Sequence, residues 1–154
     1  YDEDFSNRFK LTDKRNHGDF GYDDQGDDVF VMISWDYIYY VRIKDGARVN
    51  LASTGPDNGA GHGHLSCRAR LRKGWCYSSS NSQSRVGAFK IGIGNPEPIG
   101  ETYGGFPLYE GVAEYELWGF HRSTSGEYAS SPKATVNPSG TQILYTSDWY
   151  GRGE

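Results

Sequence analysis

The sequence predicts an all-β protein, built as an antiparallel β-sandwich, jelly roll or small barrel in a single domain over residues 1–154. The composition is the first observation: 12 tyrosines and 21 glycines stand against a single methionine, which favours strands and turns over helices. The second is a series of about eight or nine short apolar or alternating segments separated by turns. No segment of about ten residues has the periodicity of a helix.

The N-terminal third combines an acidic segment with the clearest hairpin signal. Residues 1–28 are polar and acidic, and we expect them to form a loop-rich segment. Residues 29–34 (VFVMIS) form a continuous β-branched run of strand length. The alternating residues on either side of Asp45-Gly46 predict a β-hairpin over 37–52, closed by a type I′ turn.

An alternating segment, residues 64–72 (HLSCRARLR), predicts the next strand. Apolar positions, including Leu71, would face the core, while Arg68, Arg70 and Arg72 would form a row on the outer face.

The second half of the chain predicts further strands around one long loop. Residues 86–93 (VGAFKIGI) have strand composition, and three of the six prolines in 94–107 predict a loop. Residues 108–121 predict one continuous strand, with Tyr115 and Leu117 directed inward. A last strand is expected near the C-terminus.

The cysteines and the ends of the chain favour a secreted protein. Cys67 and Cys76 lie nine positions apart, at the base of a tight hairpin, and predict a disulfide. The sequence begins at Tyr1 without an initiator methionine, as a mature secreted protein does after its leader is removed. No run approaches the ~20 apolar residues of a transmembrane helix.

Charge is segregated along the chain despite a net charge of -4. Residues 37–90 carry nine basic and two acidic residues, whereas both flanking segments are acidic. The arginine row at 68–72 would suit a multidentate anion such as an acidic glycan, a nucleic-acid phosphate or a lipid headgroup. The alternative is that the row pairs with Glu114 and Glu116 on an adjacent strand.

Aromatic residues at predicted strand ends and outer faces point to carbohydrate binding, because aromatic rings stack on the apolar faces of sugars. With the arginine row and two loop histidines they predict a glycan or anionic-ligand site. Its candidate residues are Arg68, Arg70, Arg72, His62, His64, Tyr40, Tyr103, Trp118 and Trp149, and the wider aromatic set adds Trp35, Tyr37 and Tyr150.

Specific catalytic motifs are absent, which favours a non-enzymatic role. A small secreted nuclease is nevertheless an alternative, since His64, His121 and Glu114 offer the residue types for acid–base cleavage of a phosphodiester. His62 and His64 would also suit half of a zinc site.

An aspartate-rich stretch raises the possibility of bound calcium. Calcium takes six to eight oxygen ligands from flexible loops, and aspartates interspersed with glycines supply them. The candidate ligands are Asp19, Asp23, Asp24, Asp27 and Asp28, although their spacing does not match an EF-hand; the other interpretation is a solvated acidic loop.

The favoured function is therefore a secreted recognition domain for glycans or another anionic surface ligand. A membrane-active toxin and an extracellular structural or filament subunit are further alternatives, because aromatic-rich β proteins with basic patches serve both purposes.

Overall fold

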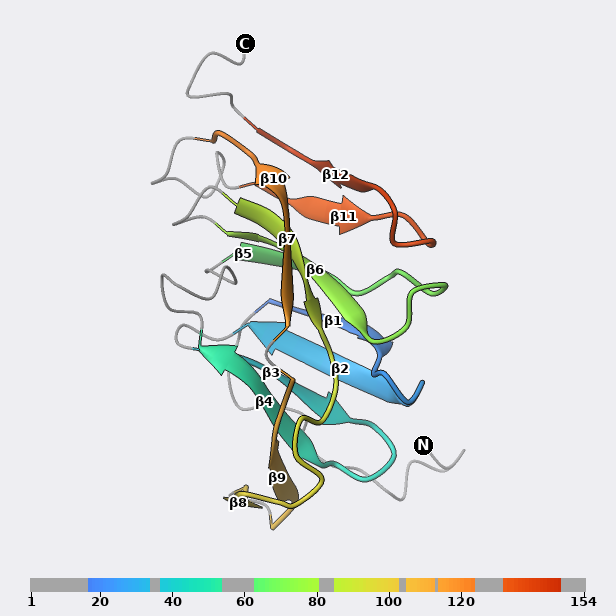
Figure 1. Cartoon of the computed structure of the whole chain (residues 1–154), viewed down its shortest axis with the longest axis vertical. Helices are drawn as coiled ribbons and strands as arrows, with labels where there is room; N and C mark the ends of the chain where they lie inside the picture. The colour runs from blue at the N-terminus through green and yellow to red at the C-terminus, as the bar shows by residue number, and fades with distance from the viewer. Residues whose placement is uncertain are drawn as a thin grey trace.

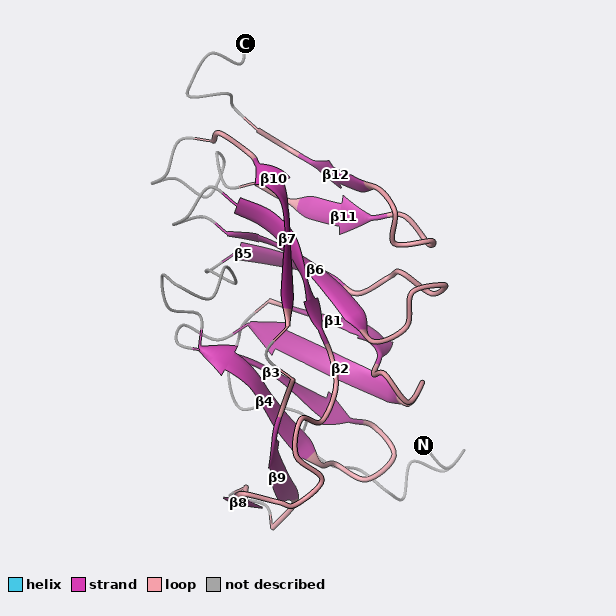
Figure 2. Cartoon of the chain, viewed as in Figure 1, coloured by secondary structure: helices cyan, strands magenta, loops and turns pink. Residues whose placement is uncertain are grey.

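The computed structural model describes residues 17–33, 37–53, 63–80, 85–102, 105–112, 114–123 and 132–147. The described residues are all strand, turn or loop, which confirms the all-β prediction (Figure 2). The strands are β1 (Gly18–Tyr22), β2 (Asp28–Ile33), β3 (Tyr37–Arg42), β4 (Arg48–Ser53), β5 (Gly63–Ser66), β6 (Trp75–Ser80), β7 (Arg85–Lys90), β8 (Gly100–Glu101), β9 (Pro107–Glu110), β10 (Tyr115–Phe120), β11 (Ala134–Val136) and β12 (Ile143–Tyr145).

Two larger sheets and one hairpin make up the architecture (Figure 1). The six-stranded sheet has the order β1-β2-β3-β4-β9-β8, the four-stranded sheet the order β10-β7-β6-β5, and β11 pairs with β12. Pairing is antiparallel except between β4 and β9, which run parallel. Strand β11 packs beside β5 and β6, and β1 lies next to β5, so the edges of the two larger sheets meet there.

The main core lies between the two larger sheets, as in a β-sandwich. Val31, Tyr40 and Val49 of the six-stranded sheet are buried in the same cluster as Cys76 and Phe89 of the four-stranded sheet. A second cluster joins the four-stranded sheet to the β11–β12 hairpin, and a third lies on the far face of the six-stranded sheet. Both faces of β2 and β3 are therefore buried, which explains why their sequences are apolar at nearly every position.

The predicted hairpin over 37–52 is confirmed as β3 and β4, but its turn is not type I′. That turn needs positive φ at both central residues, and among the described residues only Arg122 combines positive φ with a side chain. Gly46 alone takes φ of 72° here, and its amide donates to the carbonyl of Arg42 across a longer loop.

Strand β1 lies inside the segment expected to be acidic and loop-rich. Two other expectations are wrong. The predicted 94–107 loop contains the short strand β8. The continuous strand expected over 108–121 is two strands, β9 and β10, which belong to different sheets. The chain changes sheet at Gly111, whose amide donates to the carbonyl of Asn50 and which packs against Leu51.

Candidate functional site

The arginines predicted to lie along a strand lie in a turn instead, because β5 ends at Ser66. The amide of Cys67 donates to the Asp19 carboxylate of β1, at 3.0 Å, rather than continuing the ladder with β6. Residues 68–74, here called the basic turn, then connect back to β6. Cys67 and Ala69 are buried as expected, but Leu71 is 81% exposed, so its assignment to the core is wrong.

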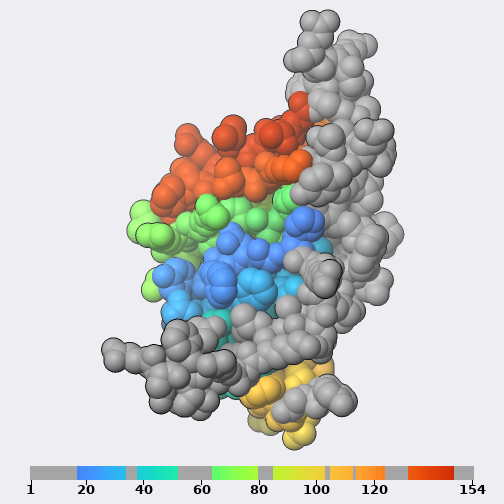
Figure 3. All heavy atoms as spheres, turned by 180° about the vertical axis from the view of Figure 1, so that it is seen from behind, coloured from blue at the N-terminus to red at the C-terminus, as the bar shows by residue number. Residues whose placement is uncertain are grey.

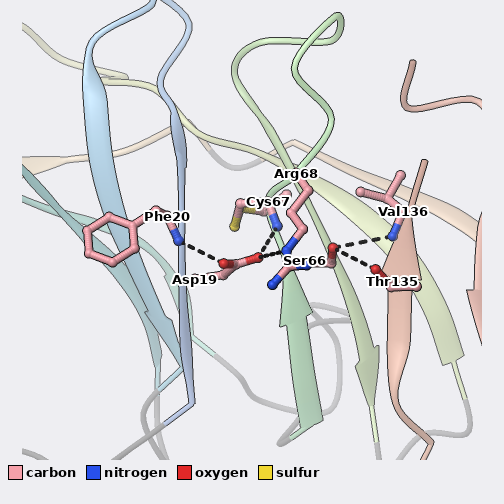
Figure 4. Close-up of a disulfide and its surroundings, with 8 residues drawn as sticks. Asp19, Phe20, Ser66, Cys67, Arg68, Thr135 and Val136 are labelled. Atoms are coloured by element: carbon pink, nitrogen blue, oxygen red, sulfur yellow. Dashed lines mark hydrogen bonds and ion pairs between the residues drawn. A yellow bond between two sulfur atoms is a disulfide. The ribbon is translucent and has the colours of Figure 1, made fainter. Parts of the chain in front are cut away.

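The basic turn is closed at its base by the predicted disulfide between Cys67 and Cys76 (Figure 4). Gly74 ends the turn with φ of 79°, and its amide donates to the carbonyl of Tyr22 at the end of β1. The amide of Leu71 donates to the carbonyl of Pro138 in the β11–β12 connection. The backbone of the turn is thus fixed at its base and again near its tip.

Arg72 fastens the turn to the four-stranded sheet. Its guanidinium lies 2.6 Å from a Glu116 carboxylate oxygen, donates to the hydroxyl of Tyr77 at 3.1 Å, and stacks over the Trp75 ring at 4.0 Å. The structure therefore shows Arg72 paired with Glu116 of β10. Glu114 pairs instead with Lys90, at 3.2 Å.

The Arg72–Glu116 pair yields a measurable coupling. A double-mutant cycle with Arg72→Met and Glu116→Gln should give about 0.5–1 kcal/mol at neutral pH, a value limited by solvent screening. The hydrogen bond from Arg72 lowers the pKa of Glu116 from its ordinary value of 4.5. The coupling should therefore persist above pH 4.5 and disappear as the pH falls through the lowered pKa.

The control for this cycle is the more exposed Lys90–Glu114 pair, for which we expect a smaller coupling. Urea unfolding of the wild type and of the six variants in the two cycles, at neutral and acidic pH, measures both couplings. Equal couplings for the two pairs would contradict the anchoring role of Arg72.

The remaining cations of the basic turn face solvent. Arg68 is exposed, and its Nε lies 3.7 Å from the Asp19 carboxylate (Figure 4). Arg70 is exposed and forms no ion pair or side-chain hydrogen bond within the described part of the chain. Lys73 is exposed, with its Nζ 5.1 Å from the centre of the Tyr22 ring. Three positive side chains are thus available on a fixed backbone.

An aromatic face on β1 and β2 adjoins the basic turn through Lys73 and Tyr22. Phe20 and Phe30 are directly opposed in register, with ring centroids 4.8 Å apart, and Phe20 is 60% exposed. The space-filling view shows β1 and β2 beside the segment that carries the basic turn (Figure 3). The sequence reasoning missed Phe20 and Tyr22, although their spacing around Gly21 is the two-residue period of a strand.

The predicted aromatic ligands are placed differently. Tyr40 is fully buried between the sheets, so its role as a surface contact is wrong. Trp118 is half-buried, packs edge-on against Tyr77, and donates from its indole nitrogen to Glu116. Tyr37 lies in β3, and its side chain is not described. Trp35, Tyr103, Trp149 and Tyr150 fall outside the described residues.

The candidate nuclease residues each interact with a different neighbour. His121 is 1% exposed, and its Nδ1 accepts the amide hydrogen of Ser123. This burial does not suit the acid–base role that the nuclease alternative gives it. Glu114 is bound to Lys90. His64 is half-buried, with its ring 4.4 Å from that of His17, and His62 lies outside the described residues.

His64 should make stability depend on pH. Burial, followed by the nearby His17 and Lys133, lowers the pKa of His64 from its ordinary value of 6.5. Between the lowered pKa and 6.5, His64 therefore binds a proton in the unfolded chain but not in the folded protein. The free energy of unfolding should fall as the pH decreases from 6.5 through the lowered pKa, and His64→Gln should flatten this slope. Urea midpoints between pH ~7 and ~5 test this, and an unchanged slope in the variant would contradict it.

The five aspartates do not form the calcium site that the sequence raised as a possibility. Asp23 is buried and accepts the amide hydrogens of Gln25 and Asp27, which closes the β1–β2 turn. Asp27 pairs with Lys44, and Asp19 binds the Cys67 amide. Within the described ranges no group of three histidine, cysteine, aspartate or glutamate residues is placed to hold a metal ion.

Comparison with known proteins gives no assignment: no family model, curated protein or solved structure matches this chain. Over the described ranges no helix is both long and apolar enough to cross a membrane. The case for function therefore comes from the basic turn and the aromatic face beside it.

Proposed function

We propose that this chain is a secreted recognition domain that binds a polyanionic surface ligand through its basic turn. The observation that carries the proposal is the set of three exposed cations, Arg68, Arg70 and Lys73, on a backbone held by a disulfide and by Arg72. Because the backbone that carries these cations is already fixed, only their side chains have to be ordered on binding, which favours affinity. Guanidinium groups bind phosphate, sulfate and carboxylate through paired hydrogen bonds.

The surroundings of the turn support the same function. Arg70 has no ion pair among the described residues, so an incoming anion displaces no intramolecular partner there. The aromatic face at Phe20 and Tyr22 offers apolar contact beside the cations. The disulfide supports an oxidising, extracellular location. Acidic glycans and phospholipid headgroups share the anionic chemistry that this surface would recognise.

Retention on immobilised heparin tests the proposal. Although the net charge of -4 opposes binding to a polyanion, we expect the wild type to be retained at low salt. Arg70→Ser should elute earlier, whereas Lys44→Ser, which removes the same charge from an existing ion pair with Asp27, should elute with the wild type. A glycan array then defines any preferred sugar. Lack of retention of the wild type would contradict the proposal.

A further inference from the structure

The basic turn carries an apolar side chain as well as cations. Leu71 is 81% exposed, the largest exposed fraction among the large hydrophobic side chains of the described residues. Its chain neighbours are Arg70 and Arg72, and Lys73 follows. The hydrogen bond from its amide to the carbonyl of Pro138 fixes its backbone, so the side chain is held outward on a rigid support. An aliphatic group so exposed at the centre of a cationic turn points to a ligand with an apolar component.

Acidic glycans and anionic bilayers would contact different side chains of this surface. A dissolved polysaccharide neutralises the cations but leaves Leu71 largely in water. A bilayer surface offers phosphates to the cations and an acyl-chain boundary directly below them to an apolar side chain. The aromatic face continues this pattern, because Tyr22 lies under Lys73 and Phe20 is exposed on the same strand. Aromatic rings are favoured at the level of the headgroups.

Resting on the proposed function, we infer that the polyanionic ligand is the surface of an anionic phospholipid bilayer. Leu71 would enter the boundary between headgroups and acyl chains, while Arg68, Arg70 and Lys73 bind headgroup phosphates. The opposite edge of the six-stranded sheet carries Glu97 and Glu101 near β8, and an anionic surface repels it.

Co-sedimentation with vesicles tests the inference. We expect the wild type to bind phosphatidylcholine vesicles that contain about 30% phosphatidylserine and not vesicles of phosphatidylcholine alone. Leu71→Ser should weaken binding about tenfold, and Arg70→Ser about fivefold. The matched control is Ile99→Ser, which removes another exposed apolar side chain beside acidic residues and should leave vesicle binding unchanged.

Heparin retention of the same proteins separates the two proposals. Leu71→Ser should keep the heparin elution of the wild type, which shows that the turn remains intact, while losing affinity for vesicles. Heparin binding without binding to phosphatidylserine vesicles would overturn the bilayer as ligand and leave the proposed function standing. Vesicle binding that Leu71→Ser does not weaken would also overturn it. Lack of retention on heparin would overturn both proposals.

Discussion

Replacement of Gly87 by alanine is expected to lower the free energy of unfolding by about 3 kcal/mol. Gly87 lies in the middle of β7, between β6 and β10, opposite Ser78 and Leu117. A Cβ atom there would meet the hydroxyl of Tyr115 and would lie 2.5 Å from the carbonyl oxygen of Glu116. The backbone contact cannot be relieved by a change of rotamer, so β10 must shift away from β7.

The control for this substitution lies on the facing strand. Gly119 of β10 is opposite Val86, and a Cβ atom added there would have no described atom within 4 Å. We therefore expect Gly119→Ala to change the free energy of unfolding by less than about 0.5 kcal/mol. Urea unfolding of both variants is the measurement, and similar stabilities would contradict the close packing of β7 against β10.

Loss of the disulfide is expected to affect both stability and binding. Replacing Cys67 and Cys76 together by alanine should cost about 3 kcal/mol, because the short loop between them gains entropy in the unfolded chain. It should also weaken retention on heparin, since the base of the basic turn is no longer closed and its cations must be ordered on binding. Urea unfolding and heparin elution of the double variant measure the two effects.

The two effects of the disulfide can be separated. Gly111→Ala should lower stability within the six-stranded sheet, because a Cβ atom there would lie 2.9 Å from the carbonyl oxygen of Asn50 and would meet Leu51. Neither neighbour belongs to the basic turn or holds it, so the folded variant should be retained on heparin as the wild type is. If the double cysteine variant, measured where it is fully folded, also elutes with the wild type, the disulfide does not organise the binding surface.

The hairpin over 37–52 could be predicted because the residues that determine it are close together in the sequence. Its alternating apolar residues and the Asp45-Gly46 pair lie within one short segment, and β3 and β4 pair directly. Even so, the turn type was wrong, because the adjoining backbone is held from elsewhere: the amide of Ile43 donates to the carbonyl of Asp28.

The basic turn could not be placed from its own residues. The apolar and polar residues of segment 64–72 alternate as in a strand. The Cys67 amide nevertheless donates a hydrogen bond to the carboxylate of Asp19, a residue 48 positions earlier in the chain. Likewise, the alternation through 108–121 does not reveal that β9 pairs with β4 and β10 with β7. Such long-range pairings decide where strands end, and a local pattern contains no information about them.

The candidate site was therefore predictable in part. Charge segregation identified the cations, and cysteine spacing identified the disulfide. The positions of three other residues were not predicted: Tyr40 lies in the core, Arg72 pairs with Glu116, and Leu71 faces solvent. A two-residue period cannot distinguish these outcomes, because both faces of β2 and β3 are covered while residues 68–74 leave the sheet.

Heparin affinity of two charge-matched triple variants tests the central role of the basic turn most directly. One variant replaces Arg68, Arg70 and Lys73 by serine; the other replaces Lys44, Lys90 and Lys133 by serine, so both lose the same net charge. We predict that the first loses heparin affinity about 10–100-fold and that the second stays close to the wild type. Equal losses in the two variants would show that binding follows net charge alone and would contradict a site at the basic turn.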